Sequence, residues 1–257
     1  MYIIFKHARF HPTIKINYMR MKNNERVIWG LLLTTIVFLI STLAGKNFSL
    51  NNEFIPDTFI TNMLMLILSI GLICGLKKHV NYKISLPKFQ NTLRPILFGL
   101  LAAIAINIIM SIVEKALGVK EIESHSAHSA MSPLQFFIFI FICTPIAEEV
   151  LFRGFLQNIL KPLKVKGIRI IKRYVSIPVI ISAVAFGLVH LIVMTSGSGT
   201  LFVIRTVVFA TTLGLIAGYY QEKYDNNAYA ITVHMAGNFV ALIAVLLASI
   251  MKYQMLC

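Results

Sequence analysis

Seven long apolar stretches, separated by short polar segments, constrain the fold of this chain more than any other feature. An α-helix needs about 20 predominantly apolar residues to cross a bilayer. The composition agrees, because 57% of the 257 residues are hydrophobic and only 13% are charged. The sequence therefore predicts an all-α, polytopic membrane helix bundle with about seven transmembrane helices. The expected spans, with approximate ends, are 27–44, 59–76, 95–117, 134–160, 175–194, 201–220 and 228–251.

Basic residues mark one side of this predicted bundle. The net charge of +14 does not indicate nucleic-acid binding, because Lys and Arg lie between the apolar stretches rather than in a polar domain. They concentrate in residues 1–26, 77–94 and 161–173, and the intervening loops are poor in them. Because cytoplasmic loops carry this excess, we expect a multi-pass cell-membrane protein with a cytoplasmic N-terminus. Frequent Ile, Lys and Asn suggest a bacterial host.

The fourth stretch carries three ionisable side chains where lipid-facing residues are expected. Glu148, Glu149 and Arg153 follow Pro145 within an apolar run. Each charge costs about 2.5–3.5 kcal/mol at the centre of a membrane helix. The i,i+4 spacing predicts that Glu149 pairs with Arg153, and Glu148 points about 100° away and is left free. Pro145 frees the carbonyl of Phe141 and is expected to kink the helix.

Two later stretches carry matching polar groups. Phe186 and His190 are four residues apart in the fifth, and His234 and Asn238 are four apart in the seventh. Taken singly, each pair is explained by hydrogen bonds between helices. Together with the two acids they predict a polar cavity inside the membrane. Arg205 begins the sixth stretch, where we expect it to extend to the membrane surface; contact with a substrate carboxylate is the alternative.

Such a cavity has the parts for peptide hydrolysis. A carboxylate serves as general base and shares a water with a neighbouring His. A second His and an Asn can donate hydrogen bonds to a developing oxyanion. The usual signatures of other intramembrane proteases, HExxH, GxSG and GxGD, are absent from the sequence. The acid of choice is Glu148.

The polar residues of the fourth, fifth and seventh stretches form three motifs. In their order along the chain, these motifs resemble the CAAX protease and bacteriocin-processing family (CPBP, or Abi) of intramembrane proteases. The likeness covers roughly residues 136–246 and includes the approach "GLIAGYYQEKYDNNAYAITVHMAGN" to the last motif. The first three stretches carry no signature of that family. The motifs are Glu148-Glu149-x-x-x-Arg153, Phe186-x-x-x-His190 and His234-x-x-x-Asn238.

The resemblance implies a role for each motif residue. Glu148 and His190 would activate the attacking water, and His234 and Asn238 would stabilise the oxyanion. Glu149 and Arg153 would support the site. No cofactor is expected, although two His and a Glu leave zinc as the alternative.

The resemblance also suggests how the chain is organised and what it acts on. We divide it into a basic cytoplasmic segment (1–26), three transmembrane helices (27–132) and a CPBP-like catalytic bundle (133–257). The expected partners are membrane lipids and a peptide or protein substrate, such as a bacteriocin-type precursor. The alternative function is a non-catalytic membrane protein that regulates a kinase, a transporter or an immunity partner. The sequence does not indicate the oligomeric state.

Overall fold

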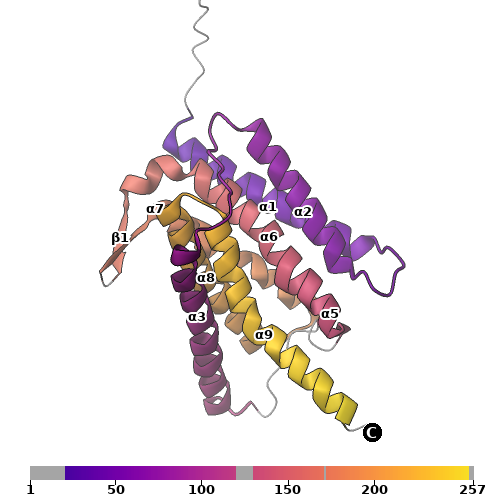
Figure 1. Ribbon diagram of the computed structural model, residues 1–257. Helices are drawn as coiled ribbons and strands as arrows, with labels where there is room; N and C mark the ends of the chain where they lie inside the picture. Colours follow the sequence, from indigo (N-terminus) through magenta and orange to yellow (C-terminus); the bar gives the residue numbers. More distant parts are fainter. Residues whose placement is uncertain (1–20, 120–129, 171, 255–257) are drawn as a thin grey trace, which may run out of the picture.

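The computed structural model describes residues 21–119, 130–170 and 172–254 as a bundle of long helices (Figure 1). Within these residues, seven helices are long and apolar enough to cross a membrane. The expected all-α membrane bundle is therefore confirmed. The largest difference at a helix start is in the third span, which begins at Phe89 rather than near residue 95. The spans are Asn23–Asn47, Thr58–Gly75, Phe89–Ala116, Pro133–Gln157, Ile177–Thr195, Thr200–Tyr224 and Ala228–Lys252.

The element bounds show that several spans are composite. The helices are α1 (Asn23–Asn47), α2 (Asp57–Gly75), α3 (Phe89–Ala116), α5 (Pro133–Gln135), α6 (Thr144–Glu149), α7 (Ile177–Val189), α8 (Thr200–Tyr224) and α9 (Ala228–Gln254). The π-helical and 3₁₀ segments are η1 (Phe136–Cys143), η2 (Val150–Gln157), η3 (Lys161–Val165) and η4 (His190–Ser196). The strands are β1 (Gly167–Ile170) and β2 (Arg173–Ser176).

The fourth span is interrupted around its proline. It runs as α5, η1, α6 and η2, so a single α-helical segment lies between two π-helical ones. The amide of Thr144 bonds to the carbonyl of Phe139, five residues back. In this wider turn, the absent N–H of Pro145 would have met the carbonyl of Ile140. We expected Pro145 to free the carbonyl of Phe141, which assumed regular α-helical bonding. With π-helical bonding the freed carbonyl is that of Ile140, one residue earlier.

Helices from the first and second halves of the chain pack together. The helices α1 and α2 pack against η2, while α3 lies along α9. At Gly99 the approach of α3 to α9 requires glycine, because an added Cβ would lie 2.5 Å from the carbonyl oxygen of Val233. Large apolar side chains outside these contacts remain exposed, as expected for a surface that faces lipid. Examples are Leu32, Ile67, Leu101, Ile108, Val184 and Leu247.

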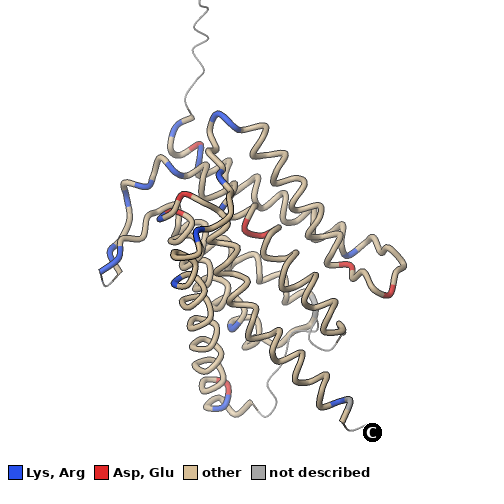
Figure 2. Tube along the Cα trace, viewed as in Figure 1, with Lys and Arg blue, Asp and Glu red and all other residues tan. Residues whose placement is uncertain are grey.

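The basic loops gather at one end of the bundle. Figure 2 shows most of the blue trace at the end where α1 begins, around the loops that follow α2 and η2. Part of the second loop forms an antiparallel hairpin in which Gly167 pairs with Ser176. Most of the expected basic segment 1–26 lies outside the described residues. This basic end is the one that the charge distribution assigns to the cytoplasm.

Asp225 forms ion pairs with two of the basic segments. It terminates α8 in a left-handed conformation, with φ of 48°. Its carboxylate accepts hydrogen bonds from Lys83 at 2.6 Å and from Lys161 at 2.7 Å. Burial raises the pKa of Asp225, but the hydrogen bonds and charges of the two lysines outweigh burial and leave the pKa below the usual value of an aspartate. This residue therefore joins the loop after α2 to the segment after η2.

We expect the stability contributed by Asp225 to be lost in acid. Because the folded-state pKa lies below the unfolded value of 3.8, the contribution is present above that pH and disappears as the pH falls through the lower, folded value. The melting temperatures of wild type and Asp225→Asn should therefore differ near neutral pH. They should converge once the pH falls below the folded-state pKa of Asp225. A difference that persists unchanged in strong acid would contradict this role.

Candidate active site

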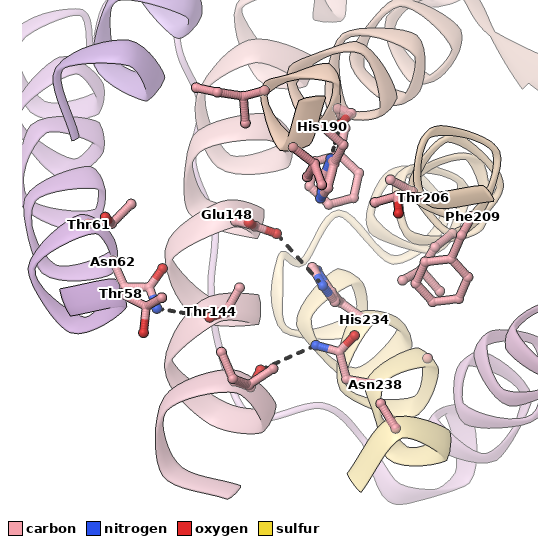
Figure 3. A pocket seen from close by; sticks show the side chains of 18 of the residues that line it. Thr58, Thr61, Asn62, Thr144, Glu148, His190, Thr206, Phe209, His234 and Asn238 are labelled. Atoms are coloured by element: carbon pink, nitrogen blue, oxygen red, sulfur yellow. Dashed lines mark hydrogen bonds and ion pairs between the residues drawn. The ribbon is translucent and has the colours of Figure 1, made fainter. Parts of the chain in front are cut away.

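The four side chains expected to do chemistry line one cavity. Its volume is about 860 Å³, near the upper end of the range of about 300–1,000 Å³ typical of ligand pockets. Glu148 comes from α6, His190 opens η4 directly after α7, and His234 and Asn238 lie one turn apart on α9 (Figure 3). Residues more than 80 positions apart in the sequence thus face a common space.

The two acids have different surroundings, as their spacing predicted. Glu149 Oε1 accepts a hydrogen bond from Arg153 Nη1 at 3.0 Å, and both side chains are almost completely buried. Glu148 instead lines the cavity, with 13% of its side chain exposed. The buried ion pair and the acid that faces the cavity are therefore separate groups on consecutive residues.

The sequence did not reveal that Glu149 also contacts His234. The Nδ1 atom of His234 lies 2.9 Å from Glu149 Oε1, the oxygen that Arg153 also reaches. Because this oxygen accepts from Arg153, Nδ1 carries the proton and donates. The other ring nitrogen, Nε2, faces Glu148 Oε2 at 3.8 Å. Glu149 therefore orients the imidazole while Glu148 faces its opposite edge.

The backbone fixes the tautomer of His190. Its Nδ1 lies 2.7 Å from the carbonyl oxygen of Phe186, which can only accept. Nδ1 therefore carries the proton and Nε2 has a free lone pair in the neutral ring. The Phe186 ring lies between the two histidines, with centroids 5.0 Å from His190 and 5.6 Å from His234. The Arg153 guanidinium lies 4.6 Å from the centre of the same ring.

Asn238 has a structural bond in addition to its place in the cavity. Its Nδ2 donates to the carbonyl of Ile140 at 3.2 Å, the group left free by Pro145. One amide hydrogen satisfies that carbonyl, and the second remains available for a ligand. The interrupted helix and the last motif are therefore linked directly.

Two polar residues of the cavity, Asn62 and Thr144, were not predicted from the sequence. Asn62 on α2 donates to Thr144 at 2.9 Å, and both residues line the cavity. Asn62 is a buried amide within an apolar span, and that signal alone could have identified it. Arg205 also lines the cavity, and it bonds to Glu114 and Ser111 of α3. The expectation that Arg205 extends to the membrane surface stays a prediction, and Glu114, two residues before the end of α3, is its acidic partner.

Glycines on α8 make room for the buried polar groups. An added Cβ at Gly214 would lie 2.5 Å from Arg153 Nη2, and one at Gly218 would lie 2.6 Å from Gln157 Oε1. By contrast, nothing lies within 4 Å of the corresponding point at Gly71 on α2. We expect Gly214→Ala to cost about 1–3 kcal/mol of stability, as overpacking does. Gly71→Ala should leave the melting temperature in detergent nearly unchanged, and equal melting of the two variants would contradict this packing.

The donor set suits zinc in type but not in arrangement. Two imidazole Nε2 atoms and a carboxylate are chemically suitable ligands. Nevertheless, no group of three or more His, Cys, Asp or Glu among the described residues is arranged to hold a metal ion. The side chains as placed do not form a zinc site, and we derive no step through a metal.

Comparison with known families identifies the segment that carries these residues. Residues 130–240 match the family model described as "Type II CAAX prenyl endopeptidase Rce1-like". This segment is therefore similar to the CAAX protease family. The match confirms the resemblance drawn from the three motifs, and it contains all six expected site residues. No curated protein and no solved structure shows significant similarity to the chain. The CAAX protease match and the seven apolar helices together support a membrane hydrolase.

Proposed function

We propose that the protein is an intramembrane endopeptidase that cuts membrane-associated protein or peptide precursors. The observation that carries the proposal is the convergence of Glu148, His190, His234 and Asn238 on one cavity. Buried polar groups are costly in a membrane unless they serve a function or pair with each other. The pairing of Glu149 with Arg153 explains two of the charges. It leaves Glu148 facing open space.

The water would be activated by Glu148 and His190. The Glu148 carboxylate and the His190 Nε2 lone pair are both acceptors, so they can hold the two hydrogens of one water. That arrangement directs an oxygen lone pair of the water toward the substrate carbonyl. Glu148 takes a proton as the C–O bond forms and returns it to the amine nitrogen as the C–N bond breaks.

The developing oxyanion would be stabilised by His234 and Asn238. With Nδ1–H held by Glu149, His234 donates from Nε2 only as the imidazolium ion. Asn238 contributes its second Nδ2 hydrogen. This role for His234 depends on Glu149, which the motif spacing alone assigned only to Arg153.

A comparison of membrane peptides tests this function. Cells carrying wild type and Glu148→Ala at equal abundance should differ in a defined set of new peptide termini within or next to hydrophobic segments. Bacteriocin-type leader peptides and similar precursors are the substrates we expect. Identical sets of termini in the two strains would count against peptidase activity.

A regulatory membrane protein is the second candidate. The family match concerns fold and motif, and some proteins on a shared fold act without catalysis. The intact set of motif residues favours the enzyme. If Glu148→Gln left the cellular phenotype of the wild type in place, a role in controlling a kinase, a transporter or an immunity partner would be favoured.

Metal dependence gives a separate prediction. If Glu148 and His190 alone activate the water, cleavage by purified protein should survive treatment with a strong chelator. The measurement is the initial rate before and after chelation, together with the zinc content of the same sample. Stoichiometric zinc, lost together with activity and restored with it on adding the metal, would overturn the metal-free mechanism.

A further inference from the structure

The cavity occupies only one half of the bundle. On α1 it is lined from Phe38 to Lys46, close to the end of that helix, whereas on α2 its lining begins at Asp57, where the helix starts. On α8 the lining residues run from Phe202 to Leu213, the first half of the helix. Because the helices alternate in direction, these segments all lie toward the same end of the molecule (Figure 1).

The other half of the bundle is solidly packed. The side chains of η2 that follow the two acids are completely buried against α1, α2 and α7. The side-chain amide of Gln157 donates hydrogen bonds to α8, at the carbonyl of Gly218 and at Gln221 Oε1. Within residues 150–160, which comprise η2 and the three residues after it, those with 0% exposure are Leu151, Phe152, Arg153, Phe155, Leu156, Ile159 and Leu160.

The loop after α2 covers the packed end from outside. The backbone N–H of Asn227 donates to the carbonyl of Lys83 at 2.9 Å, and Asn226 exchanges hydrogen bonds with Ser85. The ring of Tyr82 lies close enough to Gly154 that an added Cβ there would be 2.8 Å from it. Among the described residues, the route from this end to Glu148 is therefore filled.

The closed end is also the basic end. The covering loop and the segment after η2 contain most of the described Lys and Arg residues, as Figure 2 shows. The positive-inside rule places such loops in the cytoplasm. The end of the cavity that is lined by Lys46 of α1 and Asp57 of α2 then lies toward the opposite face of the membrane.

We propose that the cavity receives its substrates from the non-cytoplasmic side. This inference rests on the proposed function and specifies its substrate class. The substrates are peptide segments that have crossed the membrane or are anchored in its outer half, and the products leave on that side. The lining suits such a segment, because the hydroxyls of Thr58 and Thr61 can bond a peptide backbone while Phe136 and Phe209 contact its apolar side chains. Prenylated carboxyl termini in the cytoplasm lie on the wrong side.

Accessibility to a membrane-impermeant thiol reagent tests this direction. The chain for the test has Cys74, Cys143 and Cys257 replaced by Ser. Thr58→Cys reports on the cavity mouth, and Asn81→Cys on the covering loop is the matched control, since both positions are exposed. We expect Thr58→Cys to react at least about tenfold faster in intact cells than in sealed inside-out vesicles, and Asn81→Cys to show the reverse. Reaction of Thr58→Cys only in inside-out vesicles, or from neither side, would overturn the proposal.

The test separates the access direction from catalysis. Labelling requires no turnover, so the same pattern is expected when Glu148→Gln is added to the Thr58→Cys chain. Wild-type protein that does not cleave, together with Thr58→Cys labelled from outside, would contradict the proposed function and support the access direction. An active protein whose Thr58→Cys reacts only from the cytoplasmic side would contradict the access direction alone.

Discussion

Glu148→Gln is expected to slow peptide cleavage by about 10²–10⁴-fold, the usual contribution of general acid–base catalysis. The amide keeps the size of the carboxylate but cannot take a proton from water. Because Glu148 lines the cavity and has no ion-pair partner shorter than 3.8 Å among the described residues, the variant should still accumulate in the membrane. The measurement is the rate per mole of purified protein.

Two further variants sharpen this prediction. Glu53→Gln, in the exposed loop before α2, should cleave as wild type does. His190→Ala should lower the rate by a similar factor, and combining it with Glu148→Gln should add little, because groups that act as a unit are not additive. Full multiplication of the two effects would show that the residues act independently.

Arg153→Met should have the largest effect on stability, about 3–5 kcal/mol, the usual cost of breaking a buried ion pair. The change leaves the Glu149 carboxylate buried, with His234 as its remaining side-chain partner. Glu149 cannot move to water, because its side chain is only 1% exposed. Membrane abundance and the melting temperature in detergent should both fall.

A surface ion pair provides the matched control. Lys161→Met removes a bond to Asp225 in which both side chains are more than a third exposed, and should cost about 0–1 kcal/mol. Adding Glu149→Gln to Arg153→Met should restore part of the lost stability, because the unpaired charge is removed. Equal losses in Arg153→Met and Lys161→Met would show that the buried pair does not stabilise the fold.

The membrane bundle and the separation of the two acids could be predicted because both depend on local spacing. Apolar length determines where a span lies. Two side chains four residues apart, such as Glu149 and Arg153, meet on one helix face whatever the rest of the fold. The order of the motifs identified Glu148, His190, His234 and Asn238 as candidates, but their convergence depends on how three separate helices pack.

Contacts between helices could not be predicted from local spacing. The bond from His234 to Glu149 requires α9 to lie beside α6, and the pairing of Arg205 with Glu114 requires α8 to lie beside α3. The π-helical turn before Pro145 shifted the free carbonyl by one residue, which regular helical geometry does not anticipate. The direction in which the cavity opens follows from which helix halves line it, and only the packed structure contains that information.

The role of Glu148 in activating water is tested most directly by cleavage with purified protein in lipid nanodiscs, in water enriched with ¹⁸O. The substrate is a peptide whose termini distinguish wild-type cells from Glu148→Ala cells. We expect a product with ¹⁸O in its new carboxyl group, formed by wild type and at least about 10²-fold more slowly by Glu148→Gln. Labelled product formed equally by both proteins, or no cleavage by well-folded wild type, would contradict the assignment of Glu148 as the residue that activates water.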